Sequence, residues 1–179
     1  MELIATFLQI ILDKIADLEF CLFRNIYNRQ QILRSLYLKL MKIEVGEKVR
    51  IGYKFYLRNK GNLTIGDRCS IGSFTRIWNY ASISIGNDFS AAGGLTINSA
   101  THNPISLQPE GREIKIGDRV WCGVNVTIIA GVTIGNDVVI GAGAVVVKDI
   151  PNNSVVVGIP AKPIKQINRE SVEMYSPFC

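Results

Sequence analysis

The chain has 179 residues, of which 47% are hydrophobic and 20% are charged, and its formal net charge is +5. This composition is typical of a globular protein and excludes a disordered or collagen-like chain. The length suits one domain with an appendage. The modest positive charge is compatible with an anionic partner. The sequence lacks a dense basic patch with interleaved aromatic residues, so nucleic-acid binding is not predicted.

The N-terminal segment, residues 1–44, is predicted to be helical over residues 3 to about 42, because it lacks Pro and Gly and carries apolar residues at helical spacing. Its apolar run is too short to span a bilayer and lacks the features of a signal peptide. Its second half holds basic residues and no acidic one: Arg24, Arg29, Arg34, Lys39 and Lys42. Two roles stay open, a cap on the open end of the following β-structure and peripheral contact with an anionic membrane surface.

A six-residue repeat runs from Val45, as in "IGDRCS IGSFTR IWNYAS" from Ile65 and "IGDRVW CGVNVT IIAGVT" from Ile116. Position 1 of each hexad is mostly aliphatic and position 2 is often Gly. A period of six fits neither a helix nor one long strand. It predicts an all-β fold, a parallel β-helix of about five triangular coils, in which position 1 points inward and Gly at position 2 allows a tight corner.

Three hexads make one coil, and the extra residues inserted between coils always follow the third hexad. All insertions therefore leave the prism at the same edge. Coil starts lie 20 residues apart at 45, 65 and 85, then 31 apart, then 18 apart. The largest insertion, a loop of about residues 98–115, begins near His102, the only histidine of the chain. Loops on a rigid scaffold often carry functional sites, so this loop is the predicted active-site loop. The β-helix domain is expected to span residues 45–167, followed by a tail at 168–179.

The four cysteines are widely spaced, without a CxxC motif or a Cys/His pair, so neither a metal site nor a disulfide framework is expected. Reduced thiols in the cytoplasm are the expected state. Cys122 occupies an inward position 1, where it is predicted to be a small apolar filler rather than a nucleophile.

An ordered series of motifs runs from Ile116 to Lys165: a WxG element, GVTIG, VIGAGAVV, KDI and GIPAK. With this series the chain resembles the hexapeptide-repeat acetyltransferases, which include galactoside, maltose, streptogramin and serine acetyltransferases and O-acetyltransferases of bacterial surface polysaccharides. The resemblance covers roughly residues 45–167. It implies left-handed coiling, a homotrimer with active sites between subunits, and acetyl-CoA as the acetyl donor.

The resemblance also implies residue roles. His102 would be the general base, and the backbone N–H of Val124 would stabilise the oxyanion. The residues implied in CoA binding are Trp121, Gly123, Gly141, Ala142, Lys148, Lys162 and Lys165. Asn79 and Tyr80, at the corner of the preceding coil, are candidate contacts for the acceptor. What orients the His102 ring stays open among Glu110, Glu113 and a backbone carbonyl.

The predicted function is acetyl-CoA-dependent O-acetylation of a sugar in cell-surface polysaccharide biosynthesis, by direct transfer without an acyl-enzyme. Serine or a streptogramin antibiotic is the alternative acceptor, and a non-catalytic β-helix scaffold is the alternative class. A γ-class carbonic anhydrase needs three histidines, which this chain lacks. A sugar-nucleotide nucleotidyltransferase needs a nucleotide-binding domain that residues 1–44 cannot form. The predicted location is the cytoplasm, with the inner membrane face as a further hypothesis.

Overall fold

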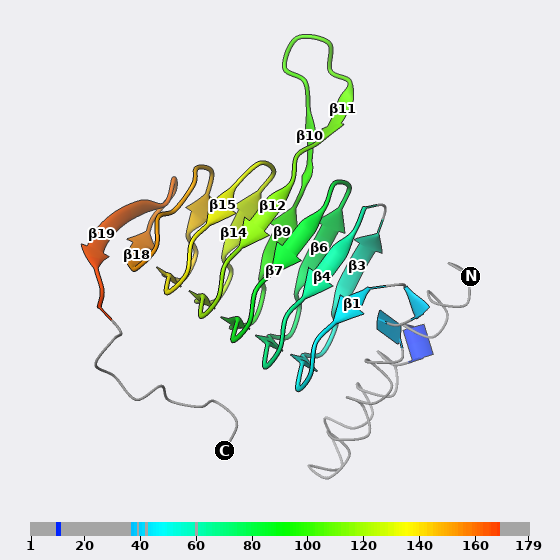
Figure 1. Cartoon of the computed structure of the whole chain (residues 1–179). Helices are drawn as coiled ribbons and strands as arrows, with labels where there is room; N and C mark the ends of the chain where they lie inside the picture. Colours follow the sequence, from blue (N-terminus) through cyan, green and yellow to red (C-terminus); the bar gives the residue numbers. More distant parts are fainter. Residues whose placement is uncertain (1–9, 12–36, 39, 42, 60, 169–179) are drawn as a thin grey trace.

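The computed structural model describes residues 10–11, 37–38, 40–41, 43–59 and 61–168. Residues 44–157 wind as a parallel β-helix whose three faces are three parallel sheets (Figure 1). This confirms the predicted fold, a left-handed β-helix of triangular coils. Each hexad forms one short strand and the corner that follows it.

The three sheets are named A, B and C, in the order in which the chain visits them. Sheet A contains β1 (Glu44–Val45), β4 (Leu63–Ile65), β7 (Ile83–Ile85), β12 (Ile114–Ile116) and β15 (Thr133–Ile134). Sheet B contains β2 (Arg50–Ile51), β5 (Ser70–Ile71), β8 (Ser90–Ala91), β13 (Trp121–Cys122), β16 (Val139–Ile140), β18 (Ser154–Val157) and β19 (Lys162–Gln166). Sheet C contains β3 (Tyr56–Asn59), β6 (Arg76–Asn79), β9 (Thr96–Asn98), β14 (Thr127–Ile129) and β17 (Val145–Val146).

The five expected coils each contribute one strand to every sheet, and part of a sixth coil follows them. In the sixth coil Ile150 bridges Ile134 in sheet A, and β18 extends sheet B. The chain then reverses, and β19 pairs antiparallel with β18. Figure 1 shows β19 at the far end of the prism, where it covers the last parallel strand.

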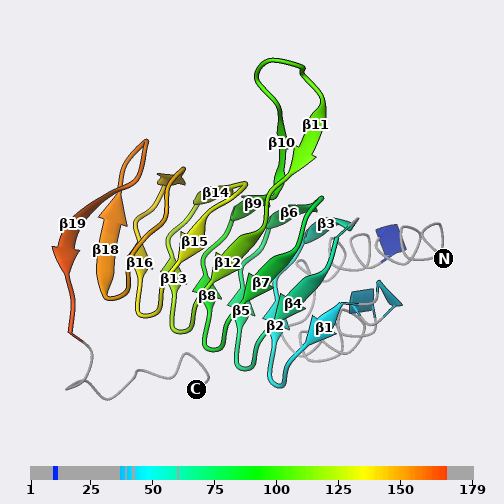
Figure 2. The same ribbon diagram turned by 45° about the horizontal axis from the view of Figure 1, so that its top comes forward.

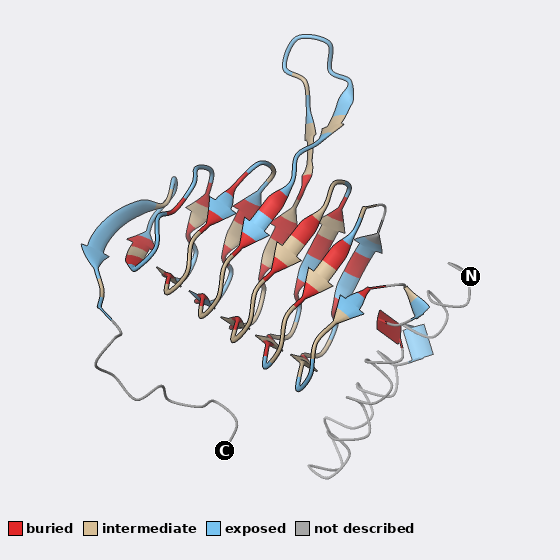
Figure 3. Ribbon diagram, viewed as in Figure 1, coloured by how far each residue is buried: buried red, intermediate tan, exposed pale blue. Residues whose placement is uncertain are grey.

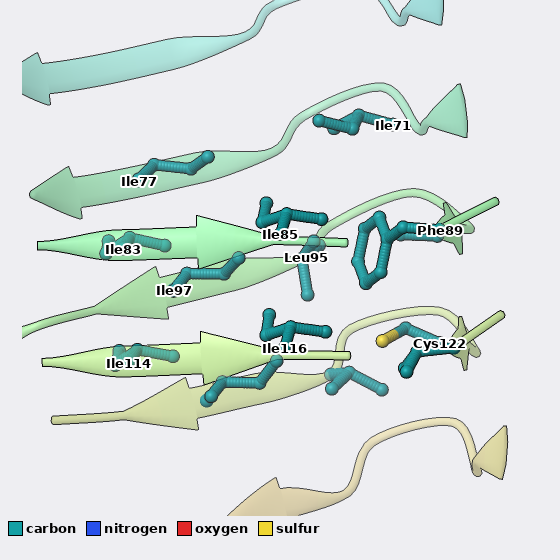
Figure 4. Packing of buried hydrophobic residues seen from close by; sticks show 14 of the residues in the cluster. Ile71, Ile77, Ile83, Ile85, Phe89, Leu95, Ile97, Ile114, Ile116 and Cys122 are labelled. Atoms are coloured by element: carbon teal, nitrogen blue, oxygen red, sulfur yellow. The ribbon is translucent and has the colours of Figure 1, made fainter. Parts of the chain in front are cut away.

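The core is a stack of side chains inside the prism. Position 1 points inward, as the repeat predicts, and position 5 is buried too, as in Phe89 and Val120. Ile65 pairs with Ile85 in sheet A, and Ile77 pairs with Ile97 in sheet C, so equal positions lie above one another. Figure 4 shows Ile77, Ile85 and Ile97 pointing into the interior, and Figure 3 shows buried positions alternating along the strands with intermediate or exposed ones. Burial of each such side chain contributes about 1.5–3 kcal/mol, which makes the stack the main source of stability.

The glycines at position 2 are required for a different reason than the one expected from the sequence. Their φ angles lie outside the left-handed region, which is occupied instead at position 4, as in Lys48 and Asp88. A Cβ atom on Gly66 would lie 2.7 Å from the carbonyl carbon of Gly86, and one on Gly117 would lie 2.8 Å from that of Gly135. The glycines therefore permit close stacking of successive coils, not the corner itself.

The edge between sheets A and B, called here the A–B edge, is closed by a ladder of side-chain oxygens. At position 3 of each coil, an Asp or Asn Oδ1 accepts a hydrogen bond from the backbone N–H of the same position one coil earlier. The ladder consists of Asp67 with Glu47, Asn87 with Asp67, Asp118 with Asn87, Asn136 with Asp118, and Asn152 with Asn136, at 2.7–2.8 Å. The position-3 N–H of each of the first five coils is thereby satisfied.

The insertion leaves the prism at the edge between sheets C and A, the C–A edge, as predicted. Its strands β10 (Ala100–His102) and β11 (Pro109–Gly111) form an antiparallel hairpin in which His102 lies opposite Pro109. Figure 2 shows this hairpin standing away from the prism between β9 and β12. The rigid coils therefore hold the only histidine of the chain on a projecting arm.

The described part of the N-terminal segment packs against the first coil. Tyr37 and Leu38 are buried in the same core cluster as Ile43. The Tyr37 carbonyl accepts a hydrogen bond of 3.0 Å from the N–H of Met41, in helical geometry. These contacts support the capping role at this point, whereas the five basic residues and most of the predicted helix lie outside the described residues. No helix in the described ranges combines the length and apolar content needed to cross a bilayer.

Candidate functional site

The edge between sheets B and C, the B–C edge, carries a vertical column of corner residues. In order along the prism they are Tyr53, Ser73, Gly93, Val124 and Ala142, one from each coil. The N–H of the residue that follows each position donates to the carbonyl of the coil below: Phe74 to Tyr53, Gly94 to Ser73, Asn125 to Gly93 and Gly143 to Val124, at 2.7–2.9 Å. We call these residues the B–C column.

The upper part of the B–C column has backbone donors without acceptors. The N–H of Tyr53 donates to Ser73 Oγ at 3.1 Å. Among the described residues, no group accepts a hydrogen bond from the N–H of Ser73, Gly93, Val124 or Ala142. Of these four residues, Val124 and Ala142 are exposed, with Val124 at 50%, whereas Ser73 and Gly93 are half-buried. Unlike the A–B edge, this edge presents stacked amide donors, and the two on exposed residues can be used by a ligand.

The turn that carries GIPAK lies on top of the same edge. The N–H of Val145 donates to the Gly158 carbonyl at 3.1 Å, and the N–H of Ala161 donates to the Val145 carbonyl at 2.8 Å. Lys162 follows directly on the exposed strand β19, which also carries Lys165. Lys162, opposite Val157, is thus attached to the upper end of the column, where it adds positive charge, whereas Lys165, opposite Val155, lies further across sheet B toward the A–B edge.

Trp121 and the two glycines of the predicted CoA site belong to the same two coils. Trp121 lies on β13 in register with Val139 and is 44% exposed. Gly123 is buried, and its Cβ position is taken by the next coil, 2.6 Å from the N of Ala142. Gly141 follows β16 and donates its N–H to the Val156 carbonyl. The two glycines therefore set the spacing of the coils, and Trp121 offers an exposed aromatic surface beside the column.

His102 and Lys148 lie at the opposite edge of sheet C from the predicted CoA residues. The hairpin with His102 starts after β9, and Lys148 follows β17, so both lie at the C–A edge. From Val124 to that edge the chain runs six residues, which corresponds to about 20 Å at the rise of a strand. A single chain therefore does not bring His102 together with the Val124 N–H.

The hairpin is organised by Asn103, which the sequence analysis did not single out. Its Oδ1 accepts hydrogen bonds from the N–H groups of Ile105 and Ser106 at 2.9 and 3.0 Å. Its Nδ2 donates to Glu110 Oε1 at 2.9 Å. An Asn directly before Pro that turns the chain is an ordinary signal for an Asx turn, and it could have been recognised.

Both acidic candidates for orienting His102 bind other groups. The Glu110 carboxylate accepts from Asn103 and forms an ion pair with Arg112 at 3.4 Å. Glu113 forms an ion pair with Lys115 at 3.0 Å. Neither bond reaches the exposed imidazole, so the hairpin positions His102 through its backbone.

The two predicted acceptor contacts differ in their exposure. Asn79 is fully buried, and its Nδ2 donates to the Gly61 carbonyl at 2.9 Å, so its side chain holds the corner together and presents no surface to an acceptor. Tyr80 is 41% exposed, and its backbone N–H donates to Ser99 Oγ. The prediction for Asn79 is therefore withdrawn, and only Tyr80 has a side chain at the surface.

The two described cysteines lack the character of nucleophiles. Cys122 is fully buried, and this burial raises the pKa of its thiol to about 12. Burial is also the main cause that raises the pKa of the Cys69 thiol to about 11. Because the thiolate is the reactive form, both groups are inert near neutral pH. In the described ranges no cluster of three His, Cys, Asp or Glu side chains could hold a metal ion.

The coils and the donor edge define a transferase built on hexapeptide repeats. The family model for "Bacterial transferase hexapeptide (six repeats)" matches residues 113–148. The chain is 34% identical over 148 residues to galactoside O-acetyltransferase of Escherichia coli, and the match covers 77% of this chain and 72% of that protein. The chain belongs to the hexapeptide-repeat acetyltransferases.

Three further similarities accompany this assignment. A putative lipopolysaccharide biosynthesis O-acetyl transferase of Escherichia coli is 34% identical over 135 residues, covering 68% of this chain and 69% of that protein. The structure of a galactoside acetyltransferase in complex with coenzyme A superposes with a TM-score of 0.69 at 25% identity, covering 97% of this chain and 86% of that one. The chain spans only 58% of another relative, a putative acetyltransferase of Schizosaccharomyces pombe.

Proposed function

We propose that this protein transfers the acetyl group of acetyl-CoA to a hydroxyl group of a sugar. The observation that carries the proposal is the pair of unpaired N–H groups of Val124 and Ala142 on the B–C column, below the basic end of the prism. The family assignment and the relatives that acetylate galactosides support the same reaction.

Three sets of residues fit acetyl-CoA. The unbonded amide N–H groups can donate hydrogen bonds to ligand oxygens, and Trp121 offers an exposed aromatic face beside them. Lys162 and Lys165, exposed on β19, suit the phosphates as point charges. Lys148 lies at the C–A edge, so it would contact a CoA molecule bound to another copy of the chain.

When bound, acetyl-CoA supplies an acetyl group as a thioester. The His102 imidazole takes the proton of the acceptor hydroxyl as its oxygen forms a bond with the carbonyl carbon. The Val124 N–H donates a hydrogen bond to the carbonyl oxygen, where negative charge develops. The C–S bond then breaks, and the imidazolium returns its proton to the thiolate. The transfer is direct and needs no acyl-enzyme, and the two described cysteines, Cys69 and Cys122, are unsuited as nucleophiles because burial raises the pKa of their thiols.

The active site is completed by a second copy of the chain. His102 and the Val124 N–H lie at opposite edges of sheet C, about 20 Å apart by strand rise, whereas proton transfer needs hydrogen-bond contact. A rotational arrangement in which the C–A edge of one copy meets the B–C edge of the next places both groups at each interface. Three copies close such a ring in the homotrimer that we propose.

We further propose a biological setting in cell-surface polysaccharide biosynthesis on the cytoplasmic side of the membrane. The lipopolysaccharide-related relative supports this setting. The basic N-terminal segment suits peripheral contact with anionic lipid. Sedimentation with vesicles of anionic and of neutral lipid tests the contact, and equal behaviour with both would contradict it.

The test of function is release of free CoA from acetyl-CoA in the presence of single acceptors: galactose, glucose, N-acetylglucosamine, serine and a streptogramin. His102→Ala should lower kcat by roughly 10²–10⁴-fold for the sugar that is acetylated, because the general base is lost. Gln108→Ala, on the same hairpin, is the matched control and should retain wild-type rates. Turnover that survives in His102→Ala would exclude His102 as the base. Turnover with serine or the antibiotic alone would reassign the acceptor.

A further inference from the structure

The outward side of sheet C carries charge in its first two coils and none in the coils that follow. Along each strand the central residue is buried, as in Leu57 and Ile77, so the residues on either side of it point away from the core. The outward residues form two rows: Tyr56, Arg76, Thr96, Thr127 and Val145 in one, and Arg58, Trp78, Asn98 and Ile129 in the other. The only charged side chains in these rows are the two arginines.

The strands β3 and β6, which lie side by side in Figure 1, bring these two arginines together with two aromatic rings. In the pairing of the strands, Tyr56 lies opposite Arg76, and Arg58 lies opposite Trp78. The rings of Tyr56 and Trp78 meet across the diagonal, with their centroids 6.1 Å apart. Both arginines are exposed. We call these four residues the C patch.

The arginines of the C patch lack the carboxylate partners that other arginines of the chain have. On the A–B edge, for comparison, Arg119 binds the Asp137 carboxylate through two nitrogens, at 2.7 and 2.8 Å. Among the described residues, no carboxylate forms an ion pair with Arg58 or Arg76. The two outward rows of sheet C also contain no acidic residue. The positive charge of the C patch is therefore not compensated by the described part of the chain.

The proposed trimer turns sheet C of every copy toward the rotation axis. In that ring the C–A edge of each copy meets the B–C edge of the next, and sheet C is the side of the prism that joins these two edges. The A–B edges must point outward, because the ring has no room for three of them inside. For a side of about 20 Å, the backbone of each sheet C lies only about 6 Å from the axis.

The C patches of the three copies therefore face one another at the same level of the axis. Each copy brings the guanidinium groups of Arg58 and Arg76 into this space. Like charges in a partly enclosed space repel, and an anion bound between them offsets the repulsion. The planar fork of donors on arginine matches the oxygens of a phosphate group, so phosphate is the anion chemistry that these side chains fit.

We propose that the trimer binds a phosphate-type anion on its three-fold axis, held by Arg58 and Arg76 of all three copies. Such an anion binds the trimer and not the single chain, so it stabilises assembly as its concentration rises. Because each active site needs residues from two copies, the anion then also controls how much of the protein is active. The inference rests on the proposed trimer and goes beyond the proposed acetyl transfer.

The first experiment measures assembly of the full-length protein by analytical ultracentrifugation in chloride, phosphate and pyrophosphate at equal ionic strength. The protein concentration at which the wild-type trimer dissociates should be at least about tenfold lower in pyrophosphate than in chloride. Calorimetric titration of pyrophosphate is then carried out on CoA-loaded protein, in which the sites for the CoA phosphates are occupied. A site on the axis should bind about one anion per three chains.

The double variant Arg58→Gln/Arg76→Gln removes both the repulsion and the anion site. It should form trimers equally well in chloride and in pyrophosphate, and it should show no binding at the axial stoichiometry. Lys48→Gln, which removes an exposed cation from the A–B edge, is the matched control and should keep the wild-type response to the anion.

The outcomes separate the anion site from the trimer. A wild-type trimer that is equally stable in all three salts would overturn the anion site and leave the trimer intact. A chain that stays monomeric in every salt would overturn both. Binding of one pyrophosphate per chain would contradict a site on the axis, and an anion response that survives in the double variant would exclude Arg58 and Arg76 as its ligands.

Discussion

The A–B and B–C edges are built from the same backbone corner, yet they meet the hydrogen-bonding needs of that corner in opposite ways. On the A–B edge an Asp or Asn oxygen from the next coil accepts the position-3 N–H of each of the first five coils, as Asn136 does for Asp118 at 2.8 Å. On the B–C edge the equivalent N–H groups of Val124 and Ala142 have no acceptor among the described residues. The comparison indicates that one edge serves stability and the other binding.

Proline substitution at position 3 gives the largest expected contrast. Proline removes a backbone N–H. Val124→Pro loses no hydrogen bond of the fold, so it should keep the wild-type unfolding midpoint while kcat falls about 10²–10³-fold through loss of the oxyanion donor. Asp118→Pro removes both the Asp118 N–H bond to Asn136 and the carboxylate acceptor of the Asn87 N–H, so it should lower the free energy of unfolding by about 2 kcal/mol or more. Urea unfolding and CoA release measure the two effects, and equal destabilisation of both variants would remove the distinction between the edges.

Glycine-to-alanine substitutions test the same contrast at a smaller scale. The Cβ of Gly117→Ala would lie 2.8 Å from the backbone of Gly135, so the coils must separate, and such overpacking costs about 1–3 kcal/mol. Gly93→Ala meets only one oxygen at 3.3 Å and should change stability by less than about 1 kcal/mol. Thermal unfolding compares the pair. A Gly93→Ala variant as unstable as Gly117→Ala would mean that the fold requires Gly93.

The pH dependence of stability tests whether the side chain just inside the B–C edge, that of Cys122, is as buried as the column outside is exposed. Cys122 lies inside the prism, two residues before Val124, and its pKa is raised from 9.0 to about 12 by burial. The unfolded thiol ionises first, so stability is full below pH of about 9 and declines as the pH rises above that value. The wild type should lose about 1 kcal/mol more than Cys122→Ala between pH 8 and pH 10, measured by urea unfolding. Parallel pH profiles would mean that the thiol is not buried in solution.

Sequence reasoning succeeded where the signal is periodic. The hexad spacing predicted the prism, the inward position of Ile77 and Ile128, and the edge at which the His102 hairpin leaves. Its explanation of the position-2 glycines was wrong, because a clash between coils depends on the distance between residues about 20 positions apart. The burial of Asn79 was missed for the same reason, since its partner Gly61 belongs to the preceding coil.

The sequence by itself determined the family, the repeat and the single histidine, because each is a property of residue identity and spacing along the chain. Only the tertiary structure decided which corner amides are capped and which are unpaired, since the acceptor for each corner comes from another coil. It also separated His102 from Val124 by the width of sheet C, and it placed Ser73, Gly93 and Val124 in one column. These contacts and distances exist only once the coils stack, because stacking brings residues that are one coil apart in the sequence to within about 5 Å of each other.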